Sequence, residues 1–205
     1  MDKILVTGGL GFIGSHTVVE LQNSGYEVVI IDDLSNSSID ILDRITSITG
    51  IRPEFEQLDL KEKDKVSAFF KNHNDIKGII HFAASKAVGE SVDKPLLYYE
   101  NNINTLVYVL QELKNLDHSN FIFSSSCTVY GQATTLPVTE DAPLQAATNP
   151  YGETKQISER IIMDTIASES VNLSSISLRY FNPIGAHPSS HIGESPLGVP
   201  NNLMP

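Results

Sequence analysis

The sequence has few of the residues that disulfide-bonded, nucleic-acid-binding or membrane proteins need. Cys127 is the single cysteine among 205 residues, so it cannot form an internal disulfide, and we expect a cytoplasmic protein. Lys and Arg number 14 against 25 Asp and Glu; the net charge of -11 argues against a nucleic-acid or membrane surface, which needs clustered cations. No apolar run reaches the length of a membrane helix. A phosphate-rich ligand would have to be bound by backbone amides and helix N-termini.

Short β-branched or apolar runs alternate with longer stretches of helical periodicity. The predicted strands are Lys3–Thr7, Val28–Asp32, Glu54–Leu58, Gly78–Phe82, Asn120–Ser125 and Leu173–Leu178. The predicted helices are Phe12–Ser24, Ile39–Ile48, Lys61–Asn72, Leu96–Leu116 and Tyr151–Glu169. Apolar strands joined by helix-length crossovers are typical of parallel pairing. We therefore expect an α/β fold, a doubly wound parallel sheet, followed after Asn182 by a loop rich in Pro, Gly, Ser and Asn.

A glycine-rich motif, TGGLGFIG, ends the first predicted strand and opens the first helix. Gly8, Gly11 and Gly14 permit a tight turn, a close approach to a pyrophosphate and close helix packing. Alone, such a triplet also fits an ordinary turn. Asp32 follows Gly14 by 18 residues, close to the spacing of a carboxylate that binds a ribose hydroxyl. The pair of features indicates dinucleotide binding, and the lack of Lys or Arg in residues 33–38 favours NAD over NADP.

A second motif places a phenol one helical turn before an amine. Tyr151 and Lys155 share a helix face, so the ammonium is expected to lower the phenol pKa and to reach a cofactor ribose. An isolated pair of this kind also occurs by chance on surface helices. Ser124, Ser125 and Ser126 end the fifth predicted strand, where ligands bind in parallel sheets. Alternation places Ser124 and Ser126 on one face of the strand and Ser125 on the other.

Six segments together resemble the extended short-chain dehydrogenase/reductase superfamily, and in particular its nucleotide-sugar epimerases. They are TGGLGFIGSHT, HFAASKAVGESV, NFIFSSSCTVYG, NPYGETK, LRYFNPIGAHPS and GVPNNLMP, and the match extends from Lys3 to Pro205. The resemblance implies a Rossmann-fold NAD-binding domain over residues 1–181 and the truncated start of a substrate-binding region over 182–205. It also implies a homodimer, and an NAD-dependent interconversion of UDP-glucose and UDP-galactose through a transient 4-keto sugar.

The resemblance further implies roles for individual residues. Tyr151 would be the catalytic base, Lys155 would orient the ribose and tune the phenol, and Ser126 would bond the reacting hydroxyl. The residues implied for the cofactor are Gly8, Gly11, Phe12, Ile13, Gly14, Asp32, Asp33, Leu34, Ser35, Asn36, Asp59, Leu60, Phe82, Ala83, Lys86, Asn101, Tyr151, Lys155 and Tyr180. Those implied for the UDP-sugar are Lys86, Ser126, Tyr151, Asn182, Asn202 and Leu203.

Three other functions compete with this interpretation. A sugar-nucleotide 4,6-dehydratase commonly has Asp and Glu just before the VYG segment, where this chain has Cys127 and Thr128. A dinucleotide-sensing protein would have no use for the trio of Ser, Tyr and Lys. A metal enzyme is disfavoured because His187 and His191 lie in a Pro- and Ser-rich loop without a third ligand, so we expect no metal.

Overall fold

The computed structural model describes residues 1–116, 119–169 and 171–195. Their core is a six-stranded, fully parallel sheet in the order β3-β2-β1-β4-β5-β6. The strands are β1 (Lys3–Thr7), β2 (Glu27–Asp32), β3 (Glu54–Gln57), β4 (Ile76–His81), β5 (Ser119–Ser126) and β6 (Leu173–Tyr180). The strand order reverses between β1 and β4, and in such sheets ligands bind beyond the carboxyl ends of the strands at that point. The predicted doubly wound sheet is confirmed.

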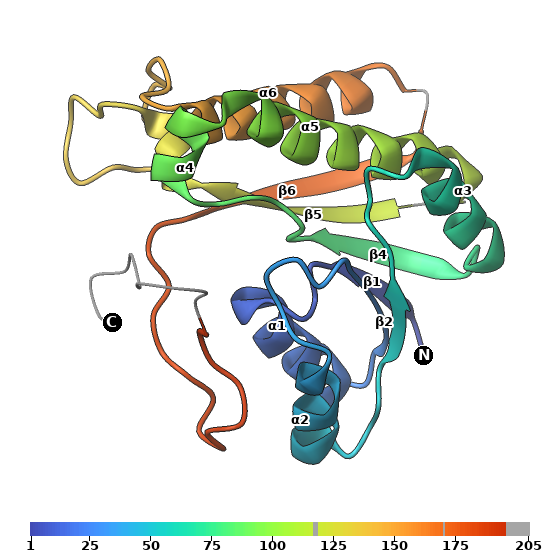
Figure 1. Ribbon diagram of the computed structural model, residues 1–205. Coiled ribbons are helices and arrows are strands. Elements are labelled where there is room, and N and C mark those ends of the chain that lie inside the picture. Colours follow the sequence, from blue (N-terminus) through green and yellow to red (C-terminus); the bar gives the residue numbers. More distant parts are fainter. Residues whose placement is uncertain (117–118, 170, 196–205) are drawn as a thin grey trace.

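Helices cover both faces of the sheet (Figure 1). The α-helices are α1 (Phe12–Asn23), α2 (Asp40–Thr49), α3 (Lys63–Asn72), α4 (Val88–Asp93), α5 (Pro95–Glu112) and α6 (Pro150–Ala167). Two short 3₁₀ helices are η1 (Leu113–Asn115) and η2 (Cys127–Tyr130). One apolar cluster lies between the sheet and α3, α5 and α6, and a second lies between the sheet and α1 and α2. This two-sided burial explains the near-continuous apolar strands.

The predicted helices are found with shifted ends, and two helices of the described residues, α4 and the 3₁₀ helix η2, were not predicted. The helix predicted over Leu96–Leu116 begins one residue earlier, at Pro95, and continues as the 3₁₀ helix η1 after Glu112. Proline fits the first helical turn because the N–H groups of that turn have no acceptor within the helix, so the N–H that proline lacks is not needed there. The six residues of α4 are too few for a periodic pattern, and the prediction had no helix there.

The segment after β6 crosses to the face covered by α1 and α2 (Figure 1). It was predicted as loop, and its described part, residues 181–195, is irregular except for one antiparallel bridge between Ala186 and Gly193. Ile192 is only 2% exposed and joins the apolar cluster under α1 and α2. The two predicted substrate residues Asn202 and Leu203 lie outside the described residues. Within the described ranges, no helix is long and apolar enough to span a membrane.

Candidate active site

The glycine-rich loop after β1 is packed too closely for side chains. Gly8 has φ +66°, and a Cβ there would lie 2.8 Å from the backbone nitrogen of Ala83, in the loop after β4. A Cβ on Gly14 would collide with the carbonyl oxygen of Gly8. Gly11 is the N-cap of α1 and, having no side chain, leaves the first-turn N–H groups open to an anion. The loop therefore forms a narrow backbone cradle at the point where the strand order reverses.

Asp32, the last residue of β2, ties this cradle to the loop that follows β2. Its Oδ2 accepts from the Leu10 backbone N–H at 3.0 Å. Its Oδ1 accepts from the Leu34 N–H at 3.0 Å and from the Ser37 hydroxyl at 2.7 Å. Because a carboxylate has about four acceptor positions, these bonds leave it room for one more donor, such as a ribose hydroxyl. The side chain is well placed for that role, since Asp32 closes one edge of the glycine cradle.

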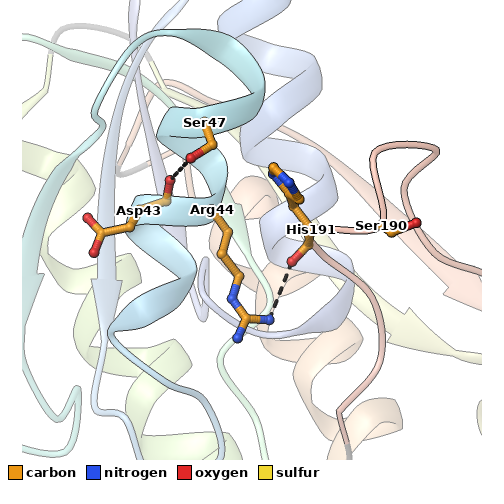
Figure 2. A pocket seen from close by; sticks show the side chains of 5 residues that line it. All are labelled: Asp43, Arg44, Ser47, Ser190 and His191. Atoms are coloured by element: carbon orange, nitrogen blue, oxygen red, sulfur yellow. Dashed lines mark hydrogen bonds between the residues drawn. The ribbon is translucent and has the colours of Figure 1, made fainter.

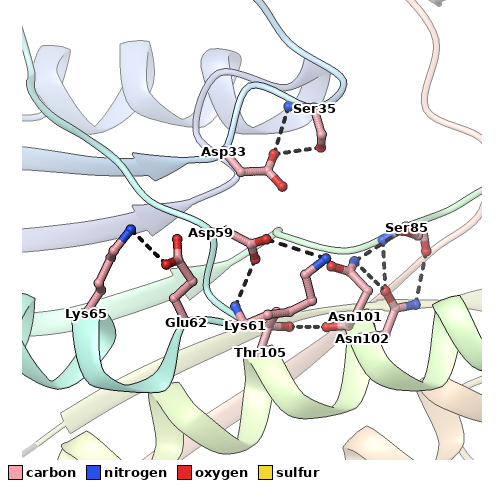
Figure 3. A network of polar contacts seen from close by, with 10 residues as sticks. All are labelled: Asp33, Ser35, Asp59, Lys61, Glu62, Lys65, Ser85, Asn101, Asn102 and Thr105. Atoms are coloured by element: carbon pink, nitrogen blue, oxygen red, sulfur yellow. Dashed lines mark hydrogen bonds and ion pairs between the residues drawn. The ribbon is translucent and has the colours of Figure 1, made fainter.

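Other residues predicted for the adenosine half lie on the loops after β2 and β3 (Figure 3). Asp33 is exposed, and its carboxylate accepts from the Ser35 N–H and hydroxyl at 2.9 and 2.6 Å. The Asp59 carboxylate accepts from the Lys61 N–H at 2.9 Å, and Leu60 is buried. These contacts hold the two loops in defined turns at the same edge of the sheet.

The loop after β4 is fastened to α5 and α6 through Asn102. Its amide oxygen accepts from the Ser85 N–H at 2.8 Å, and its amide nitrogen donates to the Ser85 carbonyl at 3.0 Å and to the Thr154 hydroxyl at 3.1 Å. The neighbouring Asn101, which was predicted to line the cofactor, donates to the Ser85 hydroxyl at 3.1 Å (Figure 3). Exposed Lys86 forms an ion pair of 3.3 Å with Glu194. Asn102 thus connects the loop after β4 to the helix that carries Tyr151.

Local sequence explains why α6 begins where it does. The Asn149 side chain caps the helix by accepting from the Gly152 N–H at 2.8 Å, and Pro150 occupies the first turn. A Cβ on Gly152 would lie 3.3 Å from the Thr128 side chain and carbonyl oxygen, so the helix start packs closely on η2. This packing brings Tyr151 to the end of β5.

Lys155 lies one turn after Tyr151 and is almost completely buried, with 3% exposure. Its ammonium donates to the Ser124 carbonyl at 2.7 Å and lies 4.8 Å from the centre of the Phe123 ring and 5.8 Å from that of Tyr151. Burial lowers the pKa of the Lys155 amine to about 8, against a smaller opposing effect of Glu159. The amine is therefore poised to change protonation near neutral pH.

The expected lowering of the Tyr151 pKa is wrong for the protein without a cofactor. Burial raises the pKa of the Tyr151 phenol, and hydrogen bonding to Ser126 only partly opposes that effect. Helical spacing predicted the neighbouring cation correctly, but it carries no information about how deeply the phenol is buried. A positive charge on a bound cofactor would act in the opposite direction to burial.

The three serines at the end of β5 have separate partners. The Ser126 hydroxyl accepts from the Thr128 N–H at 3.2 Å and from the Thr128 hydroxyl at 3.0 Å, besides its interaction with Tyr151. The Ser125 hydroxyl donates to Glu159 at 2.5 Å. Ser124 contributes its carbonyl to Lys155. The alternation therefore separates Ser125 from Ser126 as predicted, and Ser126 is the serine that lies at the phenol.

Several residues of this site were not found from the sequence. Tyr98 is fully buried, its ring centre lies 6.5 Å from that of Tyr151, and its hydroxyl donates to Glu90 at 3.0 Å. His81 is bonded to the Thr7 hydroxyl at 2.9 Å, and burial lowers its pKa to about 3, so the imidazole is neutral. Long-range contacts of this kind leave no local sequence signal.

The remaining predicted residues are spread around these loops. Phe12 and Ile13 begin α1 and are half-buried, as are Phe82 and Ala83 after β4. Burial raises the pKa of Tyr180 at the end of β6. Asn36 and Asn182 are exposed. Residues 1–116, 119–169 and 171–195 contain no group of three or more His, Cys, Asp or Glu able to hold a metal ion.

A surface pocket of about 340 Å³ lies away from this site (Figure 2). It is lined by Asp43, Arg44, Ser47, Ser190 and His191. Arg44 donates to the His191 carbonyl at 3.4 Å, so the pocket marks the contact of the 181–195 segment with α2. Because α2 and α6 cover opposite faces of the sheet, this pocket does not serve Tyr151.

Comparison with known proteins agrees with this geometry. Residues 4–197 match the model of the NAD dependent epimerase/dehydratase family. The chain belongs to this family. It is 52% identical over 202 residues to the UDP-glucose 4-epimerase of Bacillus subtilis (strain 168), a match that covers 98% of this chain and 59% of the relative. It is 51% identical to that of Dictyostelium discoideum, covering 100% of this chain and 58% of the relative. The chain thus spans about three fifths of these curated relatives.

Solved structures of UDP-glucose 4-epimerases also match. UDP-glucose-4-epimerase from Stenotrophomonas maltophila, with bound NAD and formylated UDP-arabinopyranose, has a TM-score of 0.93 and 44% identity; the match covers 100% of this chain and 60% of that one. The Bifidobacterium longum enzyme in complex with NAD+ and UDP has the same TM-score and identity, covering 98% and 60%. The chain therefore shares the fold of these structures over about three fifths of their length.

Proposed function

We propose that the protein carrying this chain is an NAD-dependent epimerase that interconverts UDP-glucose and UDP-galactose. The observation that carries the proposal is that the Tyr151 phenol interacts with Ser126 and that the buried Lys155 ammonium lies 5.8 Å from the Tyr151 ring centre. This group stands at the carboxyl end of β5, two strands from the glycine cradle. The names of the relatives and of the matching structures support the same reaction and the same two ligands.

The chain's own residues fit NAD. The cradle of Gly8, Gly11 and Gly14, which a Cβ would fill, would hold the pyrophosphate against the start of α1. Asp32 would accept from the adenosine ribose, and Lys155 would bind the nicotinamide ribose. NAD bound there would supply a hydride acceptor for C4 of the sugar and, once reduced, a hydride donor for the opposite face.

Tyr151 and Ser126 would move the proton that accompanies this transfer. Ser126 would bond the 4-hydroxyl and orient it, and Tyr151 would take its proton as the hydride leaves C4. Tyr151 would return the proton after the keto sugar has turned over, so that the stereocentre inverts without net oxidation. The raised phenol pKa means that Tyr151 needs positive charge close by to act as the base; the Lys155 ammonium supplies one such charge.

Substrate would be held chiefly beyond β6. We assign residues 1–181 to NAD binding and residues 182–205 to the start of a substrate-binding region, in which Asn182, Asn202 and Leu203 would contact the UDP-sugar. The ion pair of Lys86 with Glu194 supports this division, since it brings the later segment to the loop after β4. Dehydratase chemistry is disfavoured because Cys127 and Thr128 stand where an acid and a base are needed.

We also propose a cytoplasmic homodimer. A groove of about 290 Å³ between α5 and α6, lined partly by Leu110, Ile161 and Val171, offers a surface for a second copy. The single cysteine fits a reducing compartment. Light scattering of the full-length protein tests the dimer directly.

An activity assay with cofactor extraction tests the proposed reaction. The full-length protein is incubated with UDP-galactose, and UDP-glucose is measured through UDP-glucose dehydrogenase; denatured protein is analysed for released NAD by mass spectrometry. We expect steady UDP-glucose formation without added oxidant and about one NAD per chain. Formation of a 4-keto-6-deoxy product, or no product with NAD bound, would overturn the proposal.

A further inference from the structure

A buried carboxylate follows Lys155 at one further helical turn. Glu159 is 7% exposed and accepts three hydrogen bonds, from the Ser125 hydroxyl at 2.5 Å and from Nε and Nη2 of Arg179 at 3.0 and 2.8 Å. These donors come from β5 and β6, so the carboxylate joins α6 to both strands. Three hydrogen bonds hold the Glu159 side chain in one position, one helical turn after Lys155.

Arg179 extends the cluster to the segment between β5 and α6. Its Nη1 donates to the Tyr130 hydroxyl at 3.0 Å and to the Glu140 carbonyl at 3.4 Å, and its guanidinium lies 4.9 Å from the centre of the Tyr130 ring. The paired Glu159 raises the pKa of Arg179 above its usual range. Both charges are therefore fixed by hydrogen bonds, and the carboxylate lies one helical turn after the buried lysine.

We propose that Glu159 is a positioning residue that acts through Lys155: its carboxylate, held in place by Ser125 and Arg179, keeps the Lys155 ammonium charged beside Tyr151, and the Arg179 charge partly offsets this effect. The consequence for turnover rests on the proposed epimerase function. The effect on Lys155 itself does not, because it follows from the buried charges alone.

The other titratable groups around this position do not replace Glu159. From β4, His81 is neutral at physiological pH. From α5, Tyr98 has its pKa raised to about 12 and stays protonated, with its hydroxyl bonded to Glu90 of α4. From η2, Cys127 acts on Tyr151 in a direction that raises the phenol pKa. Against the cost of burial, Glu159 is the group that raises the pKa of Lys155.

The two charges of the cluster make opposite predictions. Glu159→Gln keeps the size of the side chain and removes its negative charge, so the pKa of Lys155 should fall. Arg179→Gln removes the positive charge that offsets Glu159, so the same pKa should rise. Ser125→Ala removes a hydrogen bond to Glu159 and leaves both charges in place. If Glu159 had a purely structural role, the two variants would not shift the pKa of Lys155 in opposite directions.

The decisive measurement is the titration of Lys155 by NMR in the full-length protein labelled with 13Cε-lysine, with the signal assigned by its loss in Lys155→Met. Relative to wild type, we expect the midpoint to move down by about 1 pH unit in Glu159→Gln and up by about half a unit in Arg179→Gln, the range for a charge close to a buried group. Ser125→Ala should leave it within about 0.3 unit. Shifts of the same sign in the two charge variants, or none, would overturn the proposal.

A second comparison removes the risk that an unpaired Arg179 unfolds the single variant. The double variant Glu159→Gln/Arg179→Gln replaces the ion pair by two neutral side chains able to bond each other. Measured against Arg179→Gln alone, it isolates the charge of Glu159, and its Lys155 midpoint should be lower by about 1 unit. Equal Lys155 titration midpoints in these two variants would also overturn the proposal.

Turnover gives the readout that depends on the proposed function. The alkaline limb of the pH profile of kcat should move with the Lys155 midpoint in each variant, downward for Glu159→Gln and upward for Arg179→Gln. Should the wild-type protein lack epimerase activity, the proposed function fails while the NMR titration still decides the role of Glu159. A limb that stays fixed while the Lys155 midpoint moves would show that Lys155 protonation does not govern turnover, which overturns the proposed link.

Discussion

The ammonium of Lys155 lies 5.8 Å from the centre of the Tyr151 ring and is held there by a 2.7 Å hydrogen bond to the Ser124 carbonyl. The phenol and the amine are thus fixed to the end of one strand, although they belong to a helix. Lys155 is buried and Tyr151 is half-buried, and burial shifts the pKa of each so that its neutral form is favoured. The ionised form of each group is therefore stabilised most by a charge of opposite sign close to it in the site.

Replacing Tyr151 by Phe tests the proton transfer. General acid–base groups contribute about 10²- to 10⁴-fold to rate, so the variant of the full-length protein should lose turnover by about that factor while retaining NAD. Coupled assay of UDP-glucose formation and mass spectrometry of released NAD measure the two effects. Tyr26→Phe, at a tyrosine that is 40% exposed, is the matched control and should keep wild-type turnover. Unchanged turnover in Tyr151→Phe would exclude the phenol as the base.

Lys155 makes the stability of the protein depend on pH with a defined sign. Its pKa is about 8 in the folded protein, against an ordinary value of 10.5. This difference corresponds to a free-energy cost of about 3 kcal/mol for burying the ammonium. Below pH 8 the folded state carries the full cost of the buried ammonium. Between these two values the unfolded chain holds a proton that the folded chain has released, so stability rises with pH.

At pH 7, the free energy of unfolding of Lys155→Met should therefore exceed that of wild type by about 1 to 3 kcal/mol, because the buried charge is gone. The variant should unfold at a higher urea concentration. The advantage should shrink steadily as the pH rises from 8 toward 10. Urea unfolding at each pH gives both values. Lys65→Met, on the exposed side of α3, controls for the loss of any lysine and should show a small difference independent of pH. A stability difference that grows with pH would contradict the folded pKa.

Sequence periodicity was sufficient for the central strands β1, β2 and β4, because strands buried on both faces have the continuous apolar runs that parallel sheets need. The glycine loop was also predictable: Gly14 has backbone of the preceding turn where its Cβ would be, and only glycine fits there. Tyr151 and Lys155 were found because helical spacing alone puts them on one face.

The rest of the site depends on contacts distant in sequence. Asn102 and Thr154 are 52 residues apart and Thr7 and His81 are 74 apart, and nothing local marks either pair. The direction of the Tyr151 pKa was also beyond the sequence, because it is decided by burial under elements that pack around the phenol. The sequence places Glu159 four residues after Lys155, but the ion pair of Glu159 with Arg179 depends on where β6 lies.

The glycine cradle predicts unequal effects of identical substitutions. Gly8→Ala places a Cβ 2.8 Å from the Ala83 backbone at φ +66°, whereas Gly50→Ala has a similar φ of +75° and open space around it. Backbone strain is common to both, at about 1 kcal/mol. We expect Gly8→Ala to lose bound NAD and a further 1 to 3 kcal/mol, about the cost of overpacking, and Gly50→Ala to keep NAD. Thermal unfolding and NAD content measure this; equal losses would mean that the close approach of the two loops is unimportant.

Cofactor choice follows from the charge at the end of β2. Asp32 is held by Leu10 and Ser37, so its carboxylate cannot swing away from the ribose, and the exposed carboxylate of Asp33 adds a second negative charge. A 2′-phosphate placed here would meet two carboxylates, and residues 33–38 contain no Lys or Arg to receive it. We expect NAD to bind at least about tenfold more tightly than NADP, a difference of about 1.4 kcal/mol. Competition between the two dinucleotides for the cofactor-free full-length protein measures the ratio. The ratio should narrow in Asp32→Asn, because the substitution removes the charge, and tighter binding of NADP by the wild-type protein would show that Asp32 does not select the cofactor.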